Sequence, residues 1–140
     1  MTNKTRKLPP AKDWRNRDID DWNVTTFTEY LRDKHRDMYG CEYVPFGGGW
    51  AREQGMLGRL IGTKAKKGTH DKRLIKEFID DTFATYNPTP QYPGTSFGFL
   101  YTYRRNVLQK LEADASRRAR AQEWAKEQRS DNDEDLDDWF

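Results

Sequence analysis

The sequence predicts a mainly α fold: a small helical domain of about four helices with a basic N-terminal arm, a projecting C-terminal helix and a disordered acidic tail. Apolar residues recur at three- and four-residue spacing in several segments, whereas a run of short alternating strands is missing. The apolar content of 34% with 14% aromatic residues predicts a modest core built from large rings. The expected parts are a basic arm, a helical domain, a helical extension and an acidic docking tail, at residues 1–23, 24–112, 113–129 and 130–140.

The arm is expected to lack an α-helix at its start, because Pro9-Pro10 block one. Its large apolar residues suggest two alternatives. They dock onto the body, or the whole arm stays solvated. These residues are Trp14, Ile19 and Trp22.

The first helix is predicted to begin at Thr26, because Thr26-x-x-Glu29 matches a capping box, and to end at Gly40. After it, Pro45 favours an extended segment over a helix, and three glycines at 47–49 form a break. One apolar stripe marks the buried face of this helix: Phe27, Tyr30, Leu31, His35 and Met38.

Three further helices follow from the same periodicity. The second runs from about Trp50 to Ile61, and the third, capped by Thr69, runs from about His70 to Tyr86. After a proline-rich loop at 87–94, the fourth starts near Ser96 and continues, with a break allowed, to about Gln128. Its second half has helix propensity but few apolar residues to bury. The third helix carries the clearest core stripe: Leu74, Ile75, Phe78, Ile79 and Phe83.

Charge is divided sharply along the chain. All 25 Lys and Arg lie at or before Arg129, and 17 acidic residues precede position 131, so residues 1–130 carry +8. The ten residues 131–140 carry six acidic groups and no basic one. A cationic body with an acidic, aromatic-ended segment indicates contact with a polyanion and docking on another protein.

The basic groups that we expect to contact nucleic acid fall into three groups. The first set, Lys64 to Arg73, surrounds the loop before the third predicted helix. The second set, Arg104 and Arg105, follows a run of aromatic residues. The third set, Arg117 to Arg120, lies on the helical extension. Cations beside aromatic rings suit phosphate contact and base stacking. A solvated surface is the alternative, and a helix-turn-helix pairing of the second and third helices is disfavoured by their long linker. The candidates are Lys64, Lys66, Lys67, His70, Lys72, Arg73, Arg104, Arg105, Arg117, Arg118 and Arg120.

The acidic tail is the predicted partner-binding segment, because exposed rings among carboxylates suit a pocket on another protein. Masking of the basic body by this tail is the alternative. The alternate spacing of acids does not match a calcium loop, because Leu136 replaces the required glycine. The expected contact residues are Leu136, Asp137, Asp138, Trp139 and Phe140.

Residues 131–140 resemble the acidic C-terminal tails, ending in Phe, of single-stranded DNA-binding proteins of bacteria and phages, whose tails recruit replication proteins. Leu136-Asp-Asp-Trp-Phe140 is also similar to the C-termini by which phage polymerases and late-transcription coactivators bind sliding clamps. The body departs from the first family, because it lacks the strand pattern of an OB-fold. The run from Trp50 to Tyr103 resembles small phage replication proteins. The resemblance implies a DNA partner, single- or double-stranded, and a protein such as a clamp, helicase or polymerase.

The sequence favours no catalyst, cofactor or metal. Gly47-Gly48-Gly49 lacks the Lys-Ser/Thr of a P-loop, and the one cysteine, Cys41, excludes both an internal disulfide and a structural zinc site. A reducing, cytoplasmic location without a membrane anchor is expected, in the bacterial host if the protein is phage-encoded. The predicted function is a non-enzymatic accessory protein for DNA replication or transcription regulation. The alternative is a protein-interaction module that modulates a host enzyme without binding DNA.

Overall fold

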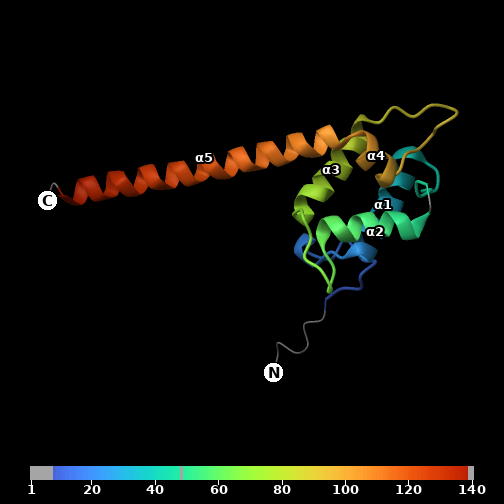
Figure 1. Ribbon diagram of the computed structural model, residues 1–140, viewed down its shortest axis with the longest axis horizontal. Helices are drawn as coiled ribbons and strands as arrows, with labels where there is room; N and C mark the ends of the chain where they lie inside the picture. Colours follow the sequence, from blue (N-terminus) through green and yellow to red (C-terminus); the bar gives the residue numbers. More distant parts are fainter. Residues whose placement is uncertain (1–7, 48, 139–140) are drawn as a thin grey trace, which may run out of the picture. The chain divides into compact units, whose positions relative to one another are not determined.

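The computed structural model describes residues 8–47 and 49–138, and side chains as far as residue 130. These ranges contain helices and loops but no β-strand, which confirms the mainly α class (Figure 1). The chain divides into two compact units, Met1–Leu108 and Gln109–Phe140. The elements, in order, are the 3-10 helix η2 (Ile19–Asp21) and the α-helices α1 (Val24–Tyr39), α2 (Trp50–Ile61), α3 (Lys72–Thr85), α4 (Phe97–Tyr103) and α5 (Arg105–Asp138).

Helix α1 begins at Val24 rather than at Thr26. The Asn23 side chain accepts a hydrogen bond from the Thr26 N–H at 3.0 Å, and the Thr26 hydroxyl accepts one from the Asn23 N–H at 3.2 Å. The capping box is therefore formed by Asn23 and Thr26, about one turn earlier than the predicted box of Thr26 and Glu29. Gly40, with φ 69°, ends the helix as expected. Met38 is 43% exposed, and the buried members of the stripe are Phe27, Tyr30, Leu31 and His35.

Helix α2 has the predicted bounds, whereas the start of α3 was predicted wrongly. The Asp71 side chain caps α3 by accepting from the Arg73 N–H at 3.1 Å. Thr69 is not the cap; its N–H and its hydroxyl instead donate to the Arg59 carbonyl of α2. The loop before α3 is therefore tied back to the end of α2.

The core of the first unit lies where α1 packs on α2 and α3, and where α2 also contacts α4. The rings of Phe78 and Phe97 meet edge to face with centroids 6.1 Å apart. Leu74 is only half-buried, so it lies at the edge of the α3 stripe. The expected core of large rings is present, and its fully buried apolar side chains are Phe27, Leu31, Leu57, Ile75, Phe78, Ile79, Phe83 and Phe97.

The described part of the arm, residues 8–23, docks onto α1. Trp22 is 3% exposed, and its ring lies 5.0 Å from the Phe27 ring. The Trp14 indole donates to the Asp33 carboxylate at 2.8 Å and meets the Tyr30 ring at 4.7 Å. The docked alternative therefore holds for these residues. Three basic residues of the arm lie outside the described range: Lys4, Arg6 and Lys7.

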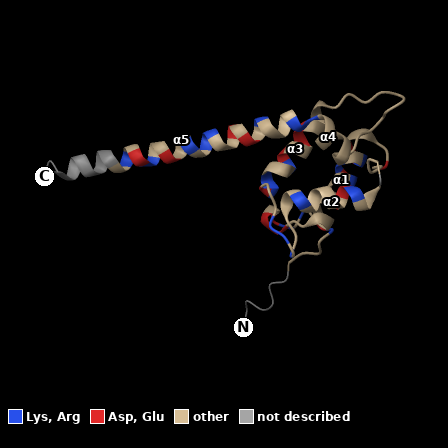
Figure 2. Cartoon of the chain, in the orientation of Figure 1, with Lys and Arg blue, Asp and Glu red and all other residues tan. Residues whose placement is uncertain are grey.

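The predicted fourth helix is divided at Arg104, whose backbone (φ −124°, ψ 29°) leaves the helical region. After this break α5 continues to Asp138, whereas the sequence predicted a helical extension to residue 129 and an acidic tail without regular structure after it. The segment holds no Gly or Pro that would stop a helix. Residues 109–130 contain no fully buried side chain, as their composition predicted. Figure 2 shows basic and acidic residues interleaved along the part of α5 that it colours by charge.

Candidate nucleic-acid interface

An ordered loop between α2 and α3 carries the first group of predicted cations. The Thr63 N–H donates to the Lys66 carbonyl at 2.8 Å, and the Thr63 hydroxyl accepts from the Ala65 and Lys66 N–H groups, both at 3.3 Å. Gly62 and Lys67 add an isolated antiparallel bridge. We call residues 63–67 the lysine loop. Its three lysines are exposed, with no ion pair in the described ranges: Lys64, Lys66 and Lys67.

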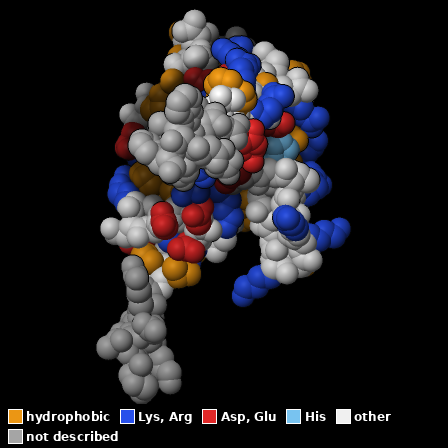
Figure 3. Space-filling model, turned by 90° about the vertical axis from the view of Figure 1, so that its left-hand side faces the viewer, with side chains coloured by type: hydrophobic (Ala, Val, Ile, Leu, Met, Phe, Trp, Pro, Cys, Tyr) orange, Lys and Arg blue, Asp and Glu red, His pale blue; other side chains and the backbone are white. Residues whose placement is uncertain are grey.

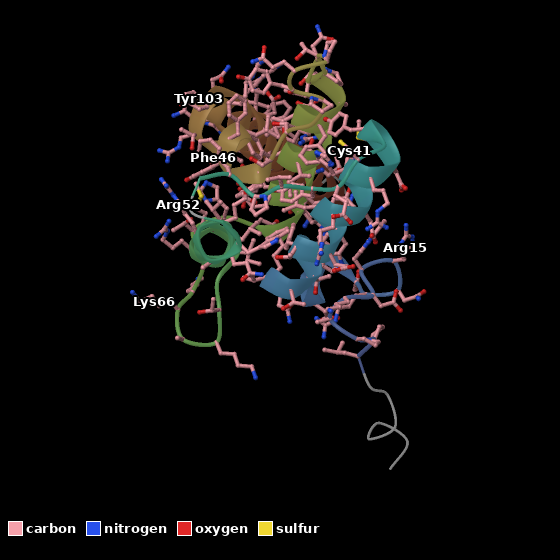
Figure 4. All side chains as sticks on the ribbon, turned by 90° about the vertical axis from the view of Figure 1, so that its right-hand side faces the viewer. Arg15, Cys41, Phe46, Arg52, Lys66 and Tyr103 are labelled. Carbon is pink, nitrogen blue, oxygen red and sulfur yellow. The ribbon has the colours of Figure 1, made fainter. Side chains whose placement is uncertain are left out.

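Two glycines form the neck of the lysine loop. A Cβ added at Gly62, where φ is 92°, would lie 2.6 Å from the Gly68 nitrogen. A Cβ added at Gly68 would lie 2.3 Å from the Ile61 carbonyl carbon. Neither position has room for a side chain, so the close backbone approach requires glycine at both. Figure 4 shows Lys66 on the loop that the neck holds away from α2, and Figure 3 shows basic side chains standing out over this loop at the lower right.

The cations at the start of α3 are engaged by the arm. The Arg73 guanidinium donates to both oxygens of the Asp20 carboxylate, at 2.6 and 3.3 Å, and the Lys72 ammonium donates to the Asp20 carbonyl at 3.0 Å. His70 Nδ1 lies 2.7 Å from the Thr69 hydroxyl. The sequence placed these three with the loop lysines, but the structure gives them protein partners that the lysine loop lacks.

An aromatic ridge lies on the same side of the first unit. We define it as Phe46, Phe99 and Tyr103. The Phe46 and Phe99 rings are 5.9 Å apart, and the Phe99 and Tyr103 rings are 4.9 Å apart. Phe99 is 38% exposed and Tyr103 is 65% exposed, so the ridge presents ring surface to solvent. Figure 4 shows Phe46, Tyr103 and Arg52 on one side, with Lys66 below them.

Two exposed arginines neighbour the ridge, one by contact and one in the sequence. A Cβ added at Gly47 would lie 3.1 Å from an Arg52 guanidinium nitrogen, so this cation lies over the loop that carries Phe46. Arg104 follows Tyr103 directly and is exposed. Neither cation forms an ion pair with another described residue. The Arg105 guanidinium lies 4.4 Å from the centroid of the Tyr101 ring, where a cation–π contact holds it.

A groove of about 740 Å³ opens beside the ridge. Its walls are the loop 41–47 and the loop 86–96, which was predicted from its prolines. The second wall is ordered, because the Tyr86 hydroxyl donates to the Tyr92 carbonyl at 2.8 Å and the Tyr92 N–H donates to the Thr89 hydroxyl at 2.9 Å. Tyr92 itself is 63% exposed. Polar and aromatic side chains that line the groove include His35, Glu42, Phe46, Tyr92, Thr95 and Phe99.

A fully buried carboxylate joins the first wall to α4. Glu53 of α2 accepts hydrogen bonds from the Phe46 N–H at 2.7 Å, from the Gly98 N–H at 3.2 Å and from the Tyr43 hydroxyl. The Tyr43 hydroxyl accepts in turn from the Phe97 N–H at 2.7 Å. Burial, then the charge of Glu53 and the bond to it, raise the pKa of Tyr43 well above its usual value. Tyr43 therefore stays protonated and donates to the carboxylate.

A buried imidazole brings the two walls together. His35 of α1 is 2% exposed, and its Nδ1 lies 2.9 Å from the Cys41 carbonyl in the first wall. Its Nε2 faces the second wall, where a Cβ added at Gly94 would approach it to 2.2 Å. As the sequence suggested, His35 is a packed residue of the apolar stripe. Its packing also sets how closely the walls approach.

The remaining predicted cations lie on α5, in the second unit. Arg117 pairs with Asp114 at 3.2 Å, and Arg118 and Arg120 are exposed. Of the predicted partner-binding residues, Leu136, Asp137 and Asp138 fall within α5, and their side chains lie outside the described part of the structure. Trp139 and Phe140 lie outside the described residues altogether.

The described residues offer neither a metal site nor a membrane-spanning helix, and the chain matches no known protein. Among the described residues, no group of three or more His, Cys, Asp or Glu is arranged to hold a metal ion. Within the same residues, no helix combines the length and apolar character needed to cross a bilayer. No protein-family model matches the chain, and no curated protein or solved structure has significant similarity to it.

The sequence did not indicate which elements meet to form the ridge and the groove. Phe46 and Arg52 were not candidates, because their proximity to Tyr103 arises from packing between distant segments. Glu53 did leave a local signal. It lies three residues after Trp50 and four before Leu57, on the apolar face of α2, where a carboxylate requires buried donors.

Proposed function

We propose that this protein binds DNA through phosphate contacts of the first unit and recruits a replication or transcription protein through residues 131–140. The lysine loop carries the proposal. It places three ammonium groups, none of which pairs with a described acidic residue, on a hydrogen-bonded backbone turn. The net charge of +8 on residues 1–130 adds long-range attraction for a polyanion.

A salt titration of DNA binding tests the phosphate contacts. If about four to six phosphates are neutralised, the logarithm of the affinity falls with the logarithm of salt concentration at a slope of roughly −3 to −5. Replacing the three loop lysines by alanine should make this slope shallower by about 0.9 for each duplex phosphate that is no longer neutralised. The effect should be similar for all DNA sequences, because phosphates carry no sequence information.

A matched control removes the same charge elsewhere. Lys12, Lys110 and Lys126 are also exposed, so their triple alanine variant changes the net charge equally. Phosphate contact by the loop predicts a larger loss of affinity in the loop variant than in the control. Equal losses would mean that net charge alone attracts DNA. No detectable binding at low salt would reject DNA binding and favour the protein-interaction module.

Recruitment through the tail is tested by deleting residues 131–140. The deletion should abolish recovery of the partner while the unfolding transition of the first unit is unchanged. Neutralising Asp131, Asp133 and Glu134 should slow association more than it speeds dissociation, because peripheral charges act mainly on the encounter. Masking of the body predicts instead that the deletion raises DNA affinity. A deletion that alters neither partner recovery nor DNA affinity would reject both roles.

A further inference from the structure

We infer that the groove and the aromatic ridge form a binding site for unpaired bases of a single strand, a refinement that rests on the proposed DNA-binding function. The site would stack bases on exposed rings and hold the adjoining phosphates with arginines. It would therefore give the protein a preference for single-stranded over duplex DNA.

The arrangement of rings supports base stacking. Phe99 and Tyr103 expose ring surface on the ridge, and Tyr92 exposes its ring on the opposite wall of the groove. The volume of about 740 Å³ falls within the range of about 300–1,000 Å³ that small-molecule sites occupy. Rings accept any base, because every base has a π-face. In a duplex these faces are covered by neighbouring base pairs, so only an unpaired strand offers them.

Charge distinguishes a nucleic-acid strand from an apolar peptide as the occupant. Arg52 lies at the Gly47 end of the groove wall, and Arg104 follows the last ring of the ridge. These cations form no ion pair with another described residue, and cations near exposed rings are the combination that single-strand sites use to follow a backbone. Glu42 is the acidic residue among those lining the groove, so its carboxylate should weaken the site.

The network of Glu53 and Tyr43 fixes the geometry of this site. It connects the N–H of Phe46, in the ridge, with the N–H groups at the start of α4, which carries Phe99 and Tyr103. Rings that are already positioned lose little conformational freedom when a base binds. The ridge is therefore preorganised by bonds to buried groups rather than assembled by the ligand.

The test compares the full chain with Tyr103→Ala and Phe99→Ala variants. The probes are a labelled oligothymidine of about 20 nucleotides, longer than the roughly 4–16 nucleotides of known single-strand sites, an oligouridine of the same length and a duplex of the same length. Trp124→Ala is the matched control, because Trp124 is 64% exposed but lies on α5, away from the ridge residues in the sequence. Tyr103 is 65% exposed, so its loss should leave folding intact. Binding is followed by fluorescence anisotropy.

The inference predicts tighter binding of oligothymidine than of duplex. Each ridge variant should lower affinity for the single strand by about fivefold to a hundredfold, the loss of one stacked base, with duplex binding unchanged. The Trp124→Ala variant should bind as the parent does, and Glu42→Gln should bind the single strand more tightly. If oligouridine binds as tightly as oligothymidine and loses affinity equally in the ridge variants, the site accepts single-stranded RNA as well as single-stranded DNA.

Several outcomes would overturn the inference. If single strand and duplex bind equally and both ridge variants have no effect, the base site is rejected while DNA binding through phosphates stands. If no probe binds at low salt, the proposed function itself fails, and the inference with it. If a peptide of residues 131–140 binds the groove and Phe99→Ala weakens that peptide but not oligothymidine, the groove is a peptide site.

Discussion

Replacing Glu53 by glutamine is the sharpest test of the network that connects the ridge to the fold. The carboxylate lies at 0% exposure and accepts from three donors: the Phe46 N–H, the Gly98 N–H and the Tyr43 hydroxyl. A glutamine whose oxygen takes the position facing the two N–H groups keeps both of those bonds. Its amide then faces the Tyr43 hydroxyl, whose hydrogen loses its acceptor.

The expected cost follows from this geometry. The substitution removes one hydrogen bond to a charged acceptor, which is worth about 1.5–3 kcal/mol. Part of this loss is offset, because the neutral glutamine avoids the cost of burying a charge. The opposite orientation of the amide would leave two N–H groups unsatisfied and cost more. Glu53→Ala leaves all three donors without a partner, at about 1–3 kcal/mol each, so the free energy of unfolding should fall by at least about 3 kcal/mol.

Urea unfolding followed by circular dichroism measures both effects, with the midpoint and slope treated as a two-state transition. Glu77→Gln is the isosteric control, because Glu77 is exposed on α3 and should change stability by less than about 0.5 kcal/mol. If Glu53→Gln is as neutral as the control, a charged acceptor is not required at this position. The charge of Glu53 and its bond to Tyr43 would then not be what holds the groove wall in place.

Three other predictions concern the core, the groove and alkaline pH. Ile75→Ala should lower the free energy of unfolding by about 2–5 kcal/mol and Leu74→Ala by clearly less in urea unfolding, because only the first is fully buried; equal costs would contradict the placement of α3. Gly94→Ala should lower thermal stability, since its Cβ would lie 2.2 Å from the buried imidazole, whereas Gly55→Ala, with no atom within 4 Å, should raise it; a tolerated Gly94→Ala would show that the walls are not in close contact. Burial raises the pKa of Tyr39 to about 12, above its value of about 10 in the unfolded chain, so the stability that its neutral form contributes is complete below about pH 10 and is lost as the pH approaches 12. Unfolding midpoints measured across this pH range should fall, and a midpoint that stays constant would contradict the burial of the phenol.

Local patterns predicted what depends on local structure. The apolar period of α2 predicted its bounds, and the stripe of α3 identified its core residues except Leu74, which lies at the edge. The starts of α1 and α3 were each misplaced by a few residues because competing polar residues, Asn23 and Asp71, satisfy the free N–H groups. Several residue types can act as caps, so the sequence alone does not decide which one is used.

The candidate site depends on contacts between distant segments, which periodicity does not report. Glu53 bonds to Gly98, 45 positions away, and Arg73 pairs with Asp20, 53 positions away. The ion pair with Asp20 occupies Arg73, which the sequence had suggested as a nucleic-acid contact. The lysine loop was predicted as a basic loop, whereas its rigid neck depends on how closely two glycines approach each other. The positions of the basic residues were therefore predictable from the sequence. Which of them are free of protein partners, and so able to contact a ligand, was not.

The glycine neck also bears on the thermodynamics of ligand binding. Because Gly62 and Gly68 already hold the lysine loop in one backbone conformation, contact with phosphates does not require the loop to fold at the same time. Binding coupled to folding buries a large apolar surface and gives a strongly negative heat-capacity change, as measured by calorimetry. An ordered loop whose lysines exchange counterions for phosphates buries little apolar surface. Binding through this loop should therefore be dominated by ion release, with an enthalpy that changes little with temperature.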